Sequence, residues 1–177
     1  MGSQSQAVNA TRLMLPPSLR GAVGVGTNRS GQPIITVDNS VKTSDVLFKN
    51  LQRVVNSPGI VSLNVVSPST PVAMTLANGS QFTAPLQAVN KNGFTLPGAS
   101  TATGNEPAFS PVKGETQIFV SSGLSNVSQA ATVAAELGAH ALPALLGQGA
   151  APSSSADHIQ REDPLVKAAI SNAQQPP

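Results

Sequence analysis

The scarcity of aromatic residues is the feature that most limits how this chain can fold. Its 177 residues include no Trp, no Tyr and five Phe, although apolar residues make up 40% of the total. The core of a domain must therefore be built mainly from Val, Leu, Ile and Ala. The length suits one domain with room for flexible ends.

The composition excludes several classes of function. Charged residues reach 10%, against roughly 25% in an average domain, so Ser, Thr, Asn and Gln must solvate the surface. The net charge is +2 without a basic cluster interleaved with aromatics, so we expect no nucleic-acid partner. The absence of Cys excludes disulfides, cysteine-ligated zinc and thiol catalysis. No apolar run approaches ~20 residues, so we expect no membrane span.

The beginning of the chain offers little structural signal. We expect residues 1–43 to form an irregular lead-in or linker, with one strand at Ile34–Val37. Gly24-x-Gly26 lacks the third glycine of a dinucleotide loop, and it is interpreted as a mobile loop. The first residues show no signal peptide. Met-Gly-Ser is also typical of a cloning remnant, which would make the chain an excised domain.

The rest of the sequence predicts a folded domain over residues 44–173 and a disordered tail over residues 174–177. We expect a helix over Ser44–Asn56 capped by Ser44, and an alternating strand over Ile60–Val66. Asn78-Gly79 and Asn92-Gly93 each predict a β-hairpin, the second between residues 86–89 and 94–96. The expected fold class is α+β, a small antiparallel sheet packed on two or three helices.

The last third of the chain has the strongest helical signals. After a strand over Thr116–Ser122, Ser125 or Asn126 can cap a helix that runs to Leu146. Pro143 is expected to kink or break it. Asp163-Pro164 should open a final amphipathic helix that ends at Ala173.

The segment Ala135-Glu136-Leu137-Gly138-Ala139-His140 resembles a zinc-peptidase helix that lacks one histidine. A histidine at Ala135 would give His-Glu-x-x-x-His, and a further change at Ala139 would give His-Glu-x-x-His. In such motifs the histidines hold Zn²⁺ and the glutamate takes a proton from the metal-bound water. Here Glu136 and His140 remain, and Ala135 stands in the place of the other ligand.

Two spacings of the metal ligands stay open. Residues four apart share a helix face, which favours positions 135 and 139, whereas residues five apart diverge by about 140° on a regular helix. The pair 135 and 140 therefore requires a local π-bulge, which Gly138 would ease. This second spacing needs only one substitution, so we favour it.

A third ligand is expected from beyond the helix. His158 is the first choice, because it follows a glycine- and serine-rich turn, and Asp157 or Glu162 are substitutes or residues that orient a ligand. Each of these side chains also has an ordinary interpretation. Glu136 and His158 would then be solvent-exposed polar residues, and His140 a histidine on the helix surface or packed inside.

Taken together, these residues resemble the zincin-like metallopeptidase toxins at the ends of bacterial secretion proteins. The resemblance covers about residues 116–160. It rests on a strand at residues 118–122, a small-residue helix start at 130–134, Ala135-Glu136, His140-Ala141 and Leu145-Leu146-Gly147. More narrowly, the chain resembles the C-terminal effector domain of a VgrG-type spike protein of the type VI secretion system.

The resemblance implies a zinc-dependent hydrolase, an antibacterial effector that cleaves a protein or peptide substrate in the periplasm of a target bacterium. An immunity protein would restrain it and a spike would carry it. Glu136 matches the general base, Ala135 the first zinc ligand, His140 the second and His158 a downstream ligand. With alanine at position 135, zinc binding would be weak or absent and the chain inactive. A natural pseudo-enzyme fits this pattern; an engineered inactive mutant fits better, since a toxin harms its expression host.

Two other functions remain. One is a non-catalytic structural or partner-binding extension of a secretion spike or phage-like fibre, which the hairpin signals and the polar, weakly charged surface favour. The other is a module that recognises cell-wall sugar, which ranks last because the chain has no Trp or Tyr for a stacking platform.

Overall fold

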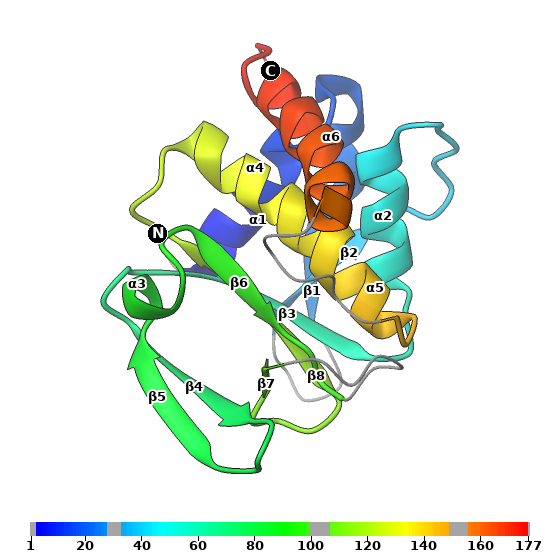
Figure 1. The fold of residues 1–177 in the computed structure, drawn as a ribbon. Coiled ribbons are helices and arrows are strands. Elements are labelled where there is room, and N and C mark those ends of the chain that lie inside the picture. The colour runs from blue at the N-terminus through cyan, green and yellow to red at the C-terminus, as the bar shows by residue number, and fades with distance from the viewer. Residues whose placement is uncertain (1–2, 28–32, 100–106, 149–155, 177) are drawn as a thin grey trace.

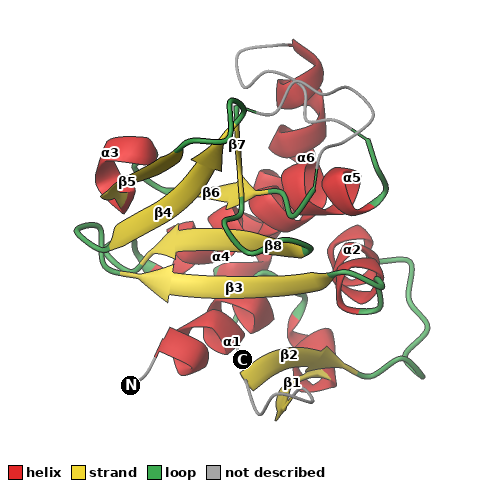
Figure 2. Ribbon diagram, turned by 90° about the horizontal axis from the view of Figure 1, so that it is seen from below, coloured by secondary structure: helices red, strands yellow, loops and turns green. Residues whose placement is uncertain are grey.

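A mixed three-stranded sheet lies at the centre of the molecule (Figures 1 and 2). The computed structural model describes residues 3–27, 33–99, 107–148 and 156–176. The strand order is β3 (Ile60–Val66), β8 (Glu115–Ser121), β6 (Gly93–Leu96). β8 is the middle strand, and it pairs in parallel with β3 and antiparallel with β6. The parallel pair departs from the antiparallel sheet that the hairpin signals predict.

Helices cover one face of this sheet (Figure 1). They are α1 (Ser3–Leu13), α2 (Val46–Val55), α4 (Asn126–Ala135), α5 (Leu142–Leu145) and α6 (Ala156–Ala173). The larger hydrophobic cluster fills the space between them and the sheet. Its buried members are Leu, Val, Ile, Ala and Met with a single aromatic residue, Phe48. The aliphatic core expected from the composition is confirmed.

A second three-stranded sheet covers the other face. Its order is β5 (Gln81–Pro85), β4 (Pro71–Leu76), β7 (Ala108–Phe109), and the short helix α3 (Leu86–Val89) follows β5. A smaller cluster of Val72, Met74, Leu86 and Leu96 joins the two sheets. The molecule therefore has a helical layer, the mixed sheet and this outer sheet, which follow one another from top to bottom in Figure 1. The α+β fold class is confirmed.

The N-terminal region belongs to the folded body. α1 contributes Ala7 and Ala10 to the larger cluster, and Met14 and Leu15 after it are also buried there. The 3-10 helix η1 (Pro17–Ala22) then leads into an antiparallel hairpin of β1 (Val23–Thr27) and β2 (Pro33–Val37). The prediction of an irregular segment over residues 1–43 is therefore wrong for its described residues.

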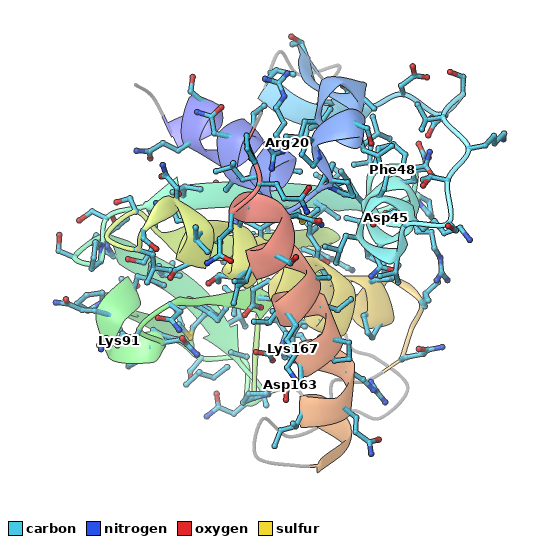
Figure 3. All side chains as sticks on the ribbon, turned by 90° about the horizontal axis from the view of Figure 1, so that it is seen from above. Arg20, Asp45, Phe48, Lys91, Asp163 and Lys167 are labelled. Carbon is cyan, nitrogen blue, oxygen red and sulfur yellow. The ribbon has the colours of Figure 1, made fainter. Side chains whose placement is uncertain are left out.

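The individual features of this region explain the error. Pro16 and Pro17 begin the 3-10 helix η1, the first as its N-cap and the second as its first residue. Gly24 and Gly26 lie within β1, where the sequence predicts a mobile loop. The strand expected at Ile34–Val37 is confirmed as β2. Figure 3 shows Arg20 of η1 beside the C-terminal end of α6, where its Nη2 donates to the backbone O of Asn172 at 2.7 Å.

Two helix starts differ from the prediction. The cap of α2 is Asp45 rather than Ser44, because Oδ2 of Asp45 accepts the backbone N–H of Phe48 at 2.9 Å. α6 begins at Ala156, well before Asp163, and Pro164 lies inside it. At the other end of α6, the backbone N–H groups of Gln174 and Gln175 donate hydrogen bonds to carbonyls of the last turn. These two residues of the tail that the sequence predicts to be disordered are therefore held by the helix.

One of the two predicted hairpins is present. β4 and β5 form an antiparallel pair whose connection contains Asn78-Gly79, with a φ of 87° at Gly79. The hairpin at Asn92-Gly93 is wrong, because residues 86–89 form α3 and β6 pairs with β8. Among the described helices, none has the length and apolar character needed to cross a bilayer.

Candidate functional site

The predicted motif lies in the middle of one long helical segment that changes its winding. α4 begins after Ser125, whose Oγ accepts the backbone N–H of Ser128 at 3.2 Å. At Glu136 the winding widens into the π-helix η2 (Glu136–Ala141), and α5 follows directly. The N–H of Leu142 donates to the carbonyl of Leu137, five residues earlier, which is the hydrogen bond that defines a π-helix.

Close packing accompanies the wide turn. A Cβ added to Gly138 would lie 2.6 Å from Cδ1 of Leu165 and 2.8 Å from Nδ2 of Asn50, so α6 and α2 both approach the backbone there. Pro143 stands just after the π-helix, and helical structure continues through it. The irregularity expected at Pro143 is therefore a widened turn before the proline rather than a break at it.

The π-helix distinguishes between the two spacings of the metal ligands that the sequence leaves open. Because its hydrogen bonds join residues five apart, such residues return to about the same side of the helix. Position 135 and His140 are spaced in this way. Ala139 and Ala135 are both buried, at 3% and 4% exposed, and of the two only Ala139 belongs to a hydrophobic cluster of the described residues. The spacing of 135 and 139 would thus direct one ligand into the aliphatic core.

Glu136 is a buried carboxylate with a defined partner. Its residue is 9% exposed. Oγ1 of Thr95, on β6, donates a hydrogen bond to Oε2 of Glu136 at 2.6 Å. This bond joins the first residue of the π-helix to the edge strand of the mixed sheet. The carboxylate is therefore held against β6 rather than lying on a solvated helix surface.

His140 faces α6. Its Nε2 lies 3.7 Å from Oε2 of Glu162, and the two side chains are 20% and 32% exposed. Burial lowers the pKa of His140 below its ordinary value, and the nearby charge of Glu162 opposes this by raising it. An imidazole and a carboxylate, both groups that bind zinc, thus meet beside the widened turn.

The remaining predicted ligands lie in the first turn of α6. Asp157 and His158 are residues of that helix, but their side chains fall outside the described part of the structure. Among the described side chains, no group of three or more His, Asp or Glu residues is arranged to hold a metal ion. A catalytic zinc site needs three protein ligands, and position 135 supplies only a methyl group. The described side chains of this chain therefore make an incomplete zinc site.

Thr95 is the residue of this region that the sequence did not reveal. Its only signal is a polar side chain between Phe94 and Leu96 in a short strand. In such a strand Phe94 and Leu96 share one face and Thr95 lies on the other, which is the face towards the π-helix.

Comparison of the chain with protein-family models, curated proteins and solved structures returned no match.

Proposed function

We propose that this chain is a zincin-like metallopeptidase-type effector domain whose metal site lacks its first ligand at Ala135. The substrate would be a protein or peptide of a target bacterium. The observation that carries the proposal is the π-helix at Glu136–Ala141. This rare geometry occurs where the five-residue spacing of position 135 and His140 requires it, and π-turns are frequent at functional sites.

The surroundings of the π-helix support the same function. Glu136, the residue that matches a general base, is buried and hydrogen-bonded. His140 lies beside Glu162, so α6 brings a carboxylate to the second ligand position. This contact favours Glu162, a substitute ligand in the sequence analysis, as a candidate for the third ligand next to His158. Bound zinc would supply an activated water, and Glu136 would accept its proton.

We propose that an extended peptide substrate binds along the edge strand β6. β6 has β8 as its partner and lies at the end of the mixed sheet, beside the helix that carries Glu136. An extended peptide can add to such an edge through backbone hydrogen bonds. A substrate held there would lie next to the buried carboxylate.

The test restores the missing ligand. Ala135→His should bind about one zinc per chain, measured by elemental analysis after dialysis, and should harm bacteria when directed to the periplasm. Ala135→Gln is the matched control, because it adds a side chain of similar size without an imidazole. Glu136→Gln in the restored chain should keep the zinc and lose the toxicity, since Glu136 handles the proton and does not bind the metal.

The opposite result would remove the proposal. If Ala135→His is folded yet holds no more zinc than Ala135→Gln, position 135 is not a ligand position. The non-catalytic structural or partner-binding role would then account better for the chain. In a zinc-binding Ala135→His chain, Glu162→Ala and His158→Ala would show which residue completes the site, because loss of a ligand releases the metal.

A further inference from the structure

β6 contacts the helical segment of α4 and η2 at two points, which lie two residues apart along the strand. A Cβ added to Gly93 would lie 2.9 Å from Cγ2 of Thr132 and 2.4 Å from the backbone O of Phe119. Two residues further along the strand, Thr95 donates to Glu136. Residues 93 and 95 share a face of the strand, and residues 132 and 136 share a face of the helix. The strand and the helix are therefore in fixed register.

This register leaves the Thr95 hydroxyl little freedom. β6 is tied to β8 by antiparallel pairing from Gly93↔Val120 to Leu96↔Gln117, and the rings of Phe94 and Phe119 stack with centroids 5.5 Å apart. Threonine is branched at Cβ, so its χ1 angle is restricted. The hydroxyl is thus presented to Glu136 from a rigid support.

We propose that Thr95 is a positioning residue that fixes the orientation of the Glu136 carboxylate. The inference rests on the proposed function for its catalytic meaning. Oε2 accepts the hydrogen bond of the hydroxyl, so β6 restrains the orientation of the carboxylate. A general base must lie within hydrogen-bond reach of the proton that it takes, so a partner that holds the carboxylate in place supports its action.

The first test uses the chain as it stands, without metal. Thr95→Val replaces the hydroxyl by a methyl group of similar size, and Thr95→Ser keeps the hydroxyl. Thr95→Val should lower the urea midpoint in the Glu136 chain more than in a Glu136→Gln chain, because the hydrogen bond to a carboxylate is the stronger one. The ¹³C carboxyl resonance of Glu136 should shift in Thr95→Val and return towards its original position in Thr95→Ser.

The second test uses the restored chain, Ala135→His, with fluorescein-labelled casein as the probe substrate. Thr95→Val should lower kcat by about 10- to 100-fold, the usual effect of losing a supporting hydrogen bond, with little change in KM or zinc content. Thr95→Ser should recover most of the activity. Thr83→Val, at an exposed threonine of β5, is the matched control and should leave kcat unchanged.

The outcomes separate the two proposals. Equal effects of Thr95→Val in the Glu136 and Glu136→Gln chains, with an unmoved carboxyl resonance, would overturn the positioning role. An unchanged kcat, or a loss that Thr95→Ser does not recover, would also overturn it. Failure of Ala135→His to take up zinc would overturn the proposed function and the catalytic meaning of the pair, while the coupling in the metal-free chain would still stand.

Discussion

Asn172 of α6 donates a hydrogen bond from Nδ2 to the backbone O of Met14 at 2.9 Å, across a separation of 158 residues. Asn172 is 9% exposed and Met14 is 1% exposed, so this bond is buried. The backbone O of Asn172 also accepts from Arg20. The last helix thus holds the N-terminal region in place through polar contacts as well as through the shared core.

Removing this side chain should destabilise the whole domain. Asn172→Ala leaves the carbonyl of Met14 without its donor inside the protein, and an unsatisfied buried group costs about 1–3 kcal/mol. The free energy of unfolding in urea should fall by that amount. Asn56→Ala is the control, because the Nδ2 of Asn56 also donates a hydrogen bond, to the side-chain Oδ1 of Asn39, but at an exposed position. Similar losses in the free energy of unfolding for the two variants would show that the buried bond to Met14 stabilises the domain no more than the exposed one.

The cap of α2 can be tested with two neighbouring residues. Asp45→Ala removes the acceptor of the Phe48 N–H. The loss of an N-cap costs about 0.5–2 kcal/mol, so the free energy of unfolding should fall by about 1 kcal/mol. Ser44→Ala should change it little, since Ser44 is exposed and precedes the cap. A larger loss in Ser44→Ala would restore the boundary predicted from the sequence.

A methyl group at Gly93 should be poorly tolerated. The nearest atom to an added Cβ would be the backbone O of Phe119 at 2.4 Å, and a backbone atom in a paired strand cannot move away easily. Overpacking of this kind costs about 1–3 kcal/mol, which thermal or urea unfolding would detect. Gly21→Ala is the matched control, because nothing lies within 4 Å of its added Cβ. Its effect should stay within about 0.5 kcal/mol.

Acidification should destabilise the metal-free chain through His140. Burial lowers the pKa of His140 in the folded protein from the ordinary value of 6.5. The unfolded chain therefore binds this proton more readily than the folded one. The contribution of His140 to the free energy of unfolding is therefore fully present above about pH 6.5, and it is lost as the pH falls through the pKa of His140 in the folded protein.

Unfolding midpoints measured between pH 7 and pH 5 would show this dependence. The loss of stability on acidification should be smaller in His140→Gln than in the unaltered chain. His158→Gln is the necessary comparison, because the chain has only two histidines. An equal loss in all three proteins would assign the pH dependence to other groups.

Local signals predicted local structure well. The strand β8, the cap at Ser125 and the helical run that follows depend on periodicity and capping within a few residues, and all three are present. α1 was missed because most of the residues that it buries are small or polar, such as Ala7, Ala10 and Thr11, and Val8 alone beside them gives no large apolar stripe. Pairing between distant strands leaves no local trace, so the position of β6 beside β8 was missed as well.

The candidate site was predictable only in part. Glu136 and His140 were found because a short motif brings them together along one helix, and the need for a π-turn followed from their spacing with Ala135. The approach of Glu162 depends on how α6 packs, and Thr95 depends on how β6 packs against the helix. Neither contact follows from sequence spacing, because each joins elements that only the complete fold brings together.

The parallel pairing of β3 with β8 sets an order on how the chain can assemble. The outer hairpin of β4 and β5 closes from adjacent residues, but β3 must wait until β8 has been synthesised and brought back to it. Distant closures of this kind slow folding. A nascent or truncated chain that stops before Glu115 would expose a long unpaired β3, the kind of edge at which chains associate with one another. Successful folding of this domain thus depends on how quickly β8, which among the described elements only α4, η2, α5 and α6 follow, reaches a strand that has been exposed since early in synthesis.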